Sequence, residues 1–241
     1  MWSEVVLLVL LTYLASAVGT ITSFGTSTIM VPTLSLFYGF NPVLLFTGLI
    51  HAVGNIGKMV FFRSGVQWKL IFLFGIPGIV FSYLGTQVLP SIPSESILRV
   101  LGIFIIAYVV YILKNPEWKL PKKNSIALAG GSLTGISAAV FGVQGAIRAL
   151  FLSAFDLKKD VFLFTAGAIG LVIDSARIIG YLESEFVLSN TLLLALLFCV
   201  PVSFLGSYTG KKLVDIIPQE KFRKLIAIAL LILAVRYLIW A

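Results

Sequence analysis

The sequence predicts an all-α polytopic membrane protein made of two inverted-topology repeats of about five hydrophobic segments each. The first indication is composition, since 59% of the 241 residues are hydrophobic and only 12% are charged. A soluble globule of this composition could not cover itself with a water-compatible surface, so lipid is the expected solvent. The second indication is that apolar runs long enough to cross a bilayer recur along the chain, and the third is that motifs of the first half return in the second.

Glycine, proline and charged residues divide the apolar sequence into ten expected segments, each followed by a short polar connection. Five of these segments fall in each half of the chain, which leaves no room for a soluble domain. Their approximate ranges are 4–18, 23–38, 43–62, 67–88, 95–113, 124–141, 144–156, 159–182, 187–212 and 220–240.

The first segment is expected to be short for a bilayer. Its apolar run, 5–18, has 14 residues and would extend about 21 Å as a helix, against a hydrocarbon thickness of about 30 Å. The first two segments of each repeat are therefore candidates for a re-entrant helical hairpin. In the first repeat its tip would be the glycine- and hydroxyl-rich stretch 19–28, which a protein-lined or wet cavity tolerates and lipid does not. The alternative is an ordinary loop at the surface.

Positive charge is distributed unevenly between the loops on alternate sides of the expected segments. One side carries most of the loop lysines and arginines, among them Arg63, Lys122 and Lys211, while the other carries only Arg99 and Arg236. By the positive-inside rule the first side is cytoplasmic, so both termini of this multi-pass protein of the cell membrane are expected to be extracytoplasmic. The net charge of +8 is spread over these short loops, which disfavours nucleic-acid binding.

Short motifs repeat between the halves without a gap. Tyr-x-Gly at 83–85 returns at 208–210, and Ile-Pro-x-Glu at 92–95 returns at 217–220, both with an offset of 125 residues. Further matched positions are Gly25 with Gly142 and Pro77 with Pro201. The chain is therefore interpreted as two copies of one unit.

This interpretation divides the chain into a first transmembrane repeat at 1–113, a basic cytoplasmic linker at 114–123 and a second repeat at 124–241. Each copy holds an odd number of segments, so the second copy enters the membrane upside down relative to the first. That is the inverted-repeat plan of many secondary transporters.

Four charged residues fall inside the apolar runs: Lys58, Arg148, Asp174 and Arg177. Placing a charge in the bilayer interior costs at least about 2.5 kcal/mol, so each is a candidate functional residue. Asn55 precedes Lys58 by three residues, as Asp174 precedes Arg177. Brought together about a pseudo-twofold axis, Lys58 and Arg177 would form a cationic site for sulfite, a sulfonate or a carboxylate, with Arg148 as a third cation.

Polar residues of the expected hairpin tips would complete this anion site. Backbone N–H groups and helix N-termini aimed at one point favour negative charge. The side chains expected to join them are Thr20, Thr22, Ser23, Thr26, Ser27 and Thr28 from the first half and Ser137 and Gln144 from the second.

Simpler interpretations of the same residues stay open. Asp174 and Arg177 are spaced to neutralise each other as a structural pair. Lys58 and Arg148 are long enough to extend to the headgroups. His51 is either a satisfied core histidine or, with Asp174, a candidate for proton coupling.

Other function classes lack the residues they need. An intramembrane enzyme would need an activated nucleophile or a metal cluster, and the chain has no Gly-x-Ser-x-Gly motif and no paired histidines. We expect no cofactor and no metal, since Cys199 and His51 are each the only residue of their kind. An anion channel could use the same groups and remains the alternative to a carrier. The expected partners are a small anion and the lipid bilayer, with no nucleic acid, and a homodimer is one assembly this plan allows.

Several motifs together resemble the TauE/SafE sulfite exporter family over essentially the whole chain. They are the stretch 19–32, Arg63-Ser64-Gly65-Val66-Gln67-Trp68, Ile76-Pro77-Gly78 with Gly85, the stretch 135–145, and Arg177 followed four residues later by Tyr181. The resemblance implies a transporter of sulfite, organosulfonates or related small anions. The family's name describes its members as exporters. Members often carry a run of glycines where this chain has Gly25-Thr26-Ser27-Thr28, so hydroxyl contacts are expected to replace some backbone contacts.

Overall fold

The computed structural model describes residues 2–22, 25–63, 65–114 and 120–213, together with residues 231, 235, 238 and 239. Within these ranges the chain forms nine α helices, one 3-10 turn and no strand. Most of the tenth expected segment, 220–240, and linker residues 115–119 lie outside the described residues. The helices are α1 (Trp2–Thr22), α2 (Ser27–Leu34), α3 (Phe40–Phe61), α4 (Trp68–Val88), α5 (Ser94–Lys114), α6 (Asn124–Phe141), α7 (Gly145–Ser153), α8 (Lys159–Glu183) and α9 (Asn190–Leu213), with the 3-10 turn η1 (Leu89–Ser91) after α4.

Six of the described helices are long and apolar enough to cross a membrane: α1, α3, α4 continued by η1, α6, α8 and α9. Their outward faces carry large apolar side chains such as Leu7, Phe72 and Leu197, each more than half exposed. Such faces need lipid rather than water around them. The expected all-α polytopic fold class is therefore confirmed.

The lengths of the first two helices correct the expected hairpin. Helix α1 has 21 residues and extends about 31 Å, so the prediction of a short first segment is wrong. The helix continues four residues into the hydroxyl-rich stretch 19–28, where Thr20 and Thr22 donate to the carbonyls of Ser16 and Val18 one turn earlier, at 2.9 and 2.8 Å. The short member of the pair is α2, with eight residues.

The second half has the same long-then-short arrangement. Helix α6 has 18 residues and α7 has nine. In both halves the long helix is followed by a glycine in the left-handed region, Gly25 at φ 83° and Gly142 at φ 67°. A residue with a Cβ adopts that conformation only with strain, so these glycines allow the chain to turn between the two helices.

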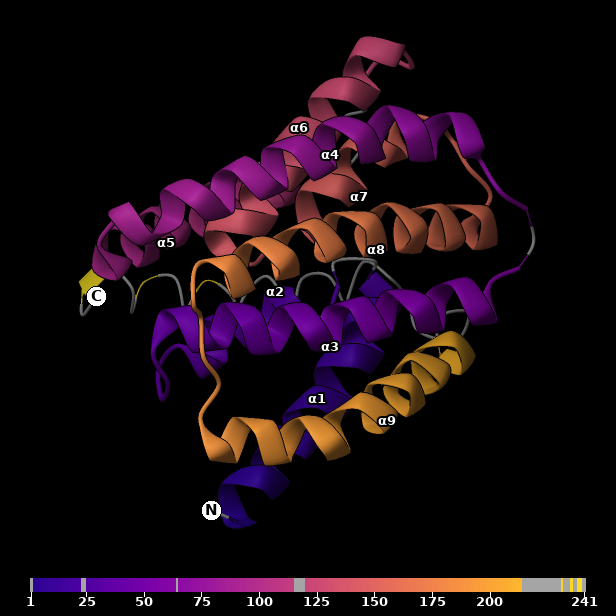
Figure 1. The fold of residues 1–241 in the computed structure, drawn as a ribbon. Coiled ribbons are helices and arrows are strands. Elements are labelled where there is room, and N and C mark those ends of the chain that lie inside the picture. Colours follow the sequence, from indigo (N-terminus) through magenta and orange to yellow (C-terminus); the bar gives the residue numbers. More distant parts are fainter. Residues whose placement is uncertain are drawn as a thin grey trace.

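Helices α3 and α8 lie side by side in the middle of the molecule, one from each half (Figure 1). On one flank α4 packs against α6 and α8, and on the other α9 packs against α1 and α3. If α1, α3 and α4 are exchanged with their second-half counterparts α6, α8 and α9, the same set of contacts results. Two copies of one unit related by a twofold axis would show this property. The inverted orientation of the copies stays a prediction that the packing supports.

Glycines bring the flanking helices into close contact. A Cβ atom at Gly206 of α9 would lie 2.6 Å from the carbonyl oxygen of Tyr13 in α1, and one at Gly210 would lie 2.6 Å from that of Ala17. At these points the helix backbones meet without intervening side chains, which is how small residues drive helix association in a bilayer.

Replacing Gly206 with alanine should therefore destabilise the protein by about 1–3 kcal/mol, because α9 has to move away from α1. The matched control is Gly75→Ala in α4, where the new methyl group would meet only Val172 at 3.4 Å. That control should leave the melting temperature unchanged or slightly higher, since alanine favours a helix. Equal melting temperatures of the two purified variants in detergent would contradict the expected close contact.

A buried cationic cluster as the candidate functional site

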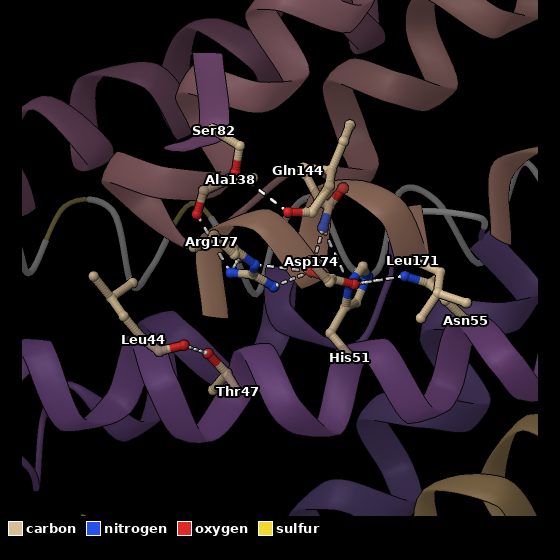
Figure 2. Close-up of polar contacts among 12 residues, drawn as sticks. Leu44, Thr47, His51, Asn55, Ser82, Ala138, Gln144, Leu171, Asp174 and Arg177 are labelled. Atoms are coloured by element: carbon tan, nitrogen blue, oxygen red, sulfur yellow. Dashed lines mark hydrogen bonds and ion pairs between the residues drawn. The ribbon is translucent and has the colours of Figure 1, made fainter. Parts of the chain in front are cut away.

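The carboxylate of Asp174 is the centre of a buried polar cluster between α3, α7 and α8 (Figure 2). Its Oδ1 accepts hydrogen bonds from Gln144 Nε2 at 2.6 Å and Arg177 Nε at 2.8 Å. Its Oδ2 accepts from His51 Nδ1 at 2.7 Å and Asn55 Nδ2 at 2.8 Å. Four donors, from α3, α8 and the N-cap residue of α7, thus satisfy one carboxylate. Helix α3 belongs to the first half of the chain, and α7 and α8 belong to the second.

The guanidinium group of Arg177 contacts Asp174 and two backbone carbonyls. Its Nη2 lies 2.6 Å from Asp174 Oδ1, and its Nη1 donates to the carbonyls of Ala138 and Gly142 at 3.3 Å each. Those carbonyls stand at the C-terminal end of α6, where a cation is favourable. Tyr181, one turn further along α8, donates to the same Ala138 carbonyl at 3.1 Å. The geometry therefore favours the structural-pair interpretation of Asp174 and Arg177 over direct contact of Arg177 with a ligand.

The guanidinium group of Arg148 has only one protein partner among the described residues. It is completely buried in α7, and its Nη1 donates to Gln144 Oε1 at 3.0 Å. Its Nε and Nη2 have no hydrogen-bond partner among the described residues. Buried N–H donors are costly to leave unpaired, so two unpaired donors on one charged group point to a missing acceptor.

Lys58 adds a second cation without a protein counter-ion. Only 3% of its surface is exposed, so the side chain does not extend to the exterior. Its ammonium group forms no hydrogen bond or ion pair within the described part of the chain. Together, Lys58, Arg148 and Arg177 place three basic side chains around the single carboxylate of Asp174, and the excess positive charge favours an anion.

Two glycines of α8 make room for this arrangement. A Cβ atom at Gly170 would lie 2.5 Å from Asn55 Nδ2 and would also collide with Arg148 Nη1, while one at Gly167 would lie 3.2 Å from Lys58 Cβ. Neither glycine was among the site residues predicted from the sequence. They precede Asp174 by seven and four residues, which places them on the same helical face, and that spacing was the available signal.

Both short helices begin beside the cluster. Gln144, the N-cap residue of α7, hydrogen-bonds to Asp174, and a Cβ atom at Gly25, just before α2, would collide with His51 Nε2. Helices α2 and α7 also contact each other. Their N-terminal ends carry partial positive charge, which adds to the preference for an anion. His51 Nε2 is itself buried and has no partner among the described residues.

The expected hydroxyl contacts of the hairpin tips are not assembled at this cluster. Thr22 bonds to its own helix, and Ser137 donates to the carbonyl of Val143. Thr26 and Ser27 are buried but form no hydrogen bond with the cations of the cluster within the described residues. Ser23 lies outside the described residues. The structure thus unites Asn55, Lys58, Gln144, Arg148, Asp174, Arg177 and His51. Among the described residues, no hydrogen bond from Thr26, Ser27 or Ser137 reaches the cations of this cluster.

Membrane-crossing helices that enclose a positively charged polar cluster, with the short helices α2 and α7 beginning beside it, are typical of a multi-pass membrane transporter. The chain belongs to the TauE/SafE sulfite exporter family, whose family model matches residues 8–237. It is also 25% identical over 243 aligned residues to a probable membrane transporter protein of Methanocaldococcus jannaschii, with 90% of this chain and 89% of that protein covered. The resemblance expected from the sequence motifs is confirmed.

Proposed function

We propose that this protein is a secondary transporter that exports a small anion, such as sulfite or an organosulfonate, across the cell membrane. The observation that supports the proposal most directly is that Nε and Nη2 of buried Arg148 have no partner in the described part of the chain, and that a second buried cation, Lys58, belongs to the same cluster. A guanidinium presents a planar set of donors that matches two oxygens of an oxyanion, and an ammonium adds a point charge. The family's name supports sulfite as the first anion to test.

The residues of the cluster take distinct roles in this proposal. Arg148 and Lys58 bind the anion directly. Asp174 and Arg177 are positioning residues that hold α3, α7 and α8 together through their shared hydrogen bonds. Gln144 orients Arg148, since its Oε1 accepts from Nη1. The proton-coupling role foreseen for His51 and Asp174 stays a prediction, and His51 Nε2 is the atom that would exchange the proton.

Alternating access is the proposed mechanism. Lys58 lies on α3 and Asp174 on α8, which come from opposite halves of the chain and pack together at the centre. Movement of one half against the other would change which side reaches the anion. The loop charges place both termini outside the cell in this scheme, so that exposed Arg63 and Lys122 face the cytoplasm.

An anion panel tests the binding site. Potassium salts of sulfite, methanesulfonate, sulfate and chloride are added to the purified protein in detergent at equal ionic strength, and the melting temperature is measured. A bound anion should raise it by mass action. Lys58→Gln should weaken that anion's affinity by about tenfold or more without lowering the unliganded stability, because the Lys58 ammonium group has no hydrogen bond or ion pair among the described residues.

The control for charge alone is Lys69→Gln, which removes an exposed cation and should leave the affinity unchanged. If no anion stabilises the protein, or if both variants bind as the wild type does, the proposed site is wrong. Flux in proteoliposomes then separates the classes: a carrier saturates and shows trans-stimulation, a channel gives large currents, and an enzyme converts the anion without moving it.

A further inference from the structure

The imidazole of His51 carries an unused hydrogen-bond acceptor at the edge of the cationic cluster. Its Nδ1 lies 2.7 Å from Asp174 Oδ2, and a carboxylate oxygen can only accept, so Nδ1 carries a hydrogen and donates it. In the neutral ring Nε2 then has a lone pair and no hydrogen. Nε2 is buried and has no hydrogen-bond partner among the described residues.

The backbone next to Nε2 does not supply the missing donor. His51 faces the break between α1 and α2, where a Cβ atom on Gly25 would collide with Nε2. The N–H of Gly25 is already donated to the carbonyl of Gly19 at 3.3 Å. A second acceptor of the cluster, Oδ1 of Asn55, is also buried and has no partner in the described part of the chain. Because unpaired buried acceptors are costly, these two atoms indicate a donor that comes from a ligand.

These acceptors share the site with the cations that would hold an anion. His51, Asn55 and Lys58 are spaced by four and three residues, which places them on one face of α3. A Cβ atom on Gly170 of α8 would lie 2.5 Å from Asn55 Nδ2 and would also collide with Arg148 Nη1, so the amide and the guanidinium group meet there. The cluster therefore offers unused donors on Arg148 together with unused acceptors on His51 and Asn55.

We propose that the anion bound by this cluster carries a hydrogen-bond donor of its own, which donates to His51 Nε2 while Arg148 donates to the anion's oxygens. The class is a singly charged sulfur oxyanion with a hydroxyl group, either hydrogensulfite or a short hydroxyalkanesulfonate. Sulfate and unsubstituted alkanesulfonates, whose oxygens only accept, leave Nε2 unpaired. An ammonium donor, as in an aminosulfonate, is opposed by the charges of Arg148 and Lys58.

This inference rests on the proposed anion transport and adds which anions the site prefers. One hydroxyl donor and two oxygen acceptors on a small molecule would pair Nε2 of His51 together with Nε and Nη2 of Arg148, the three atoms that the described protein leaves unpaired. These atoms are enclosed by protein, so a ligand reaches them only when one half moves against the other, as in the proposed mechanism.

Two sulfonates of equal charge test the preference. Ethanesulfonate and hydroxyethanesulfonate share the sulfonate group and differ by a single hydroxyl. Their dissociation constants for the purified protein are measured by titration calorimetry in detergent, as potassium salts at equal ionic strength. The wild type should bind hydroxyethanesulfonate about tenfold more tightly or better, because the analogue without the hydroxyl leaves a buried acceptor unpaired.

A matched pair of variants on α3 tests the acceptor. His51→Asn keeps an amide N–H near the position of Nδ1 for Asp174 but removes Nε2, so it should abolish most of the preference for hydroxyethanesulfonate. The control is Thr47→Val, one turn earlier, where the lost hydroxyl donates to the carbonyl of Val43 at 2.7 Å. Thr47→Val should keep the preference. Since the preference is a ratio of two affinities in one protein, a change in stability alone does not alter it.

Sulfite at two pH values distinguishes the two sources of the hydroxyl. Ethanesulfonate is the reference at each pH, because its own charge is constant and its binding reports any titration of the groups around His51. Those groups are Lys58 on α3, Arg148 on α7, and Asp174 and Arg177 on α8. The affinity for total sulfite relative to ethanesulfonate should rise on acidification as hydrogensulfite forms. A constant ratio would exclude hydrogensulfite and leave the hydroxyalkanesulfonates as the class.

The inference is wrong if both sulfonates bind the wild type equally, or if His51→Asn keeps the preference. In either case the ethanesulfonate titration still reports whether the cationic cluster binds an anion, so the proposed function is judged separately. If neither sulfonate nor sulfite binds, the proposed function fails and this inference fails with it.

Discussion

Arg148→Gln should abolish anion binding and at the same time raise the stability of the unliganded protein. The side chain is fully buried, and two of its three guanidinium nitrogens have no partner in the described structure. Removing a directly bound charge from a buried anion site costs about 2–5 kcal/mol, which corresponds to an affinity loss of about thirtyfold or more. Removing an uncompensated buried cation relieves its desolvation, so the unliganded protein should gain about 1 kcal/mol or more.

The predicted loss of anion affinity together with a gain in stability distinguishes a ligand contact from a structural role. A residue with a purely structural role would lower both the melting temperature and the anion affinity when replaced. The measurements are the melting temperature without ligand and its shift with sulfite or methanesulfonate. Arg63→Gln, which removes an exposed arginine, serves as the control and should change neither. A destabilised Arg148→Gln protein that still binds the anion would overturn the assignment of Arg148.

Asp174→Asn should destabilise the protein by about 3–5 kcal/mol. The carboxylate accepts from His51, Asn55, Gln144 and Arg177, and it is the only acidic group in the described cluster. Its neutral replacement leaves the Arg177 charge buried without a counter-ion, which is the costly way to break a buried pair. The amide group also brings its own donors into a place where four donors already converge.

A double-mutant cycle separates the ion pair from the rest of the network. Adding Arg177→Gln to Asp174→Asn removes the orphaned charge and should restore part of the lost stability. Glu185→Gln, at an exposed position just after α8, should change the melting temperature little. Strictly additive effects of the two cluster substitutions would show that Asp174 and Arg177 do not act as a pair.

The sequence by itself determined that the chain is a polytopic helical membrane protein and which charges matter. Lipid requires every spanning segment to satisfy its own backbone and to present apolar side chains, so composition and apolar runs report the fold class directly. The same solvent makes a charge in an apolar run exceptional, which singled out Lys58, Arg148, Asp174 and Arg177. Matched motifs also indicated two related halves, and the helix contacts agree with them.

Only the tertiary structure decided which of those charges is available to a ligand. Arg177 matched Lys58 across the repeat and was the expected anion contact, yet it is paired with Asp174 and with two carbonyls of α6. Arg148 has no match in the repeat, and its Nε and Nη2 have neither a hydrogen bond nor an ion pair among the described residues. A residue's partners come from helices far away in sequence, as His51 and Asp174, 123 positions apart, illustrate. Periodicity places a side chain on a helix face, but what stands opposite that face depends on how the two halves pack.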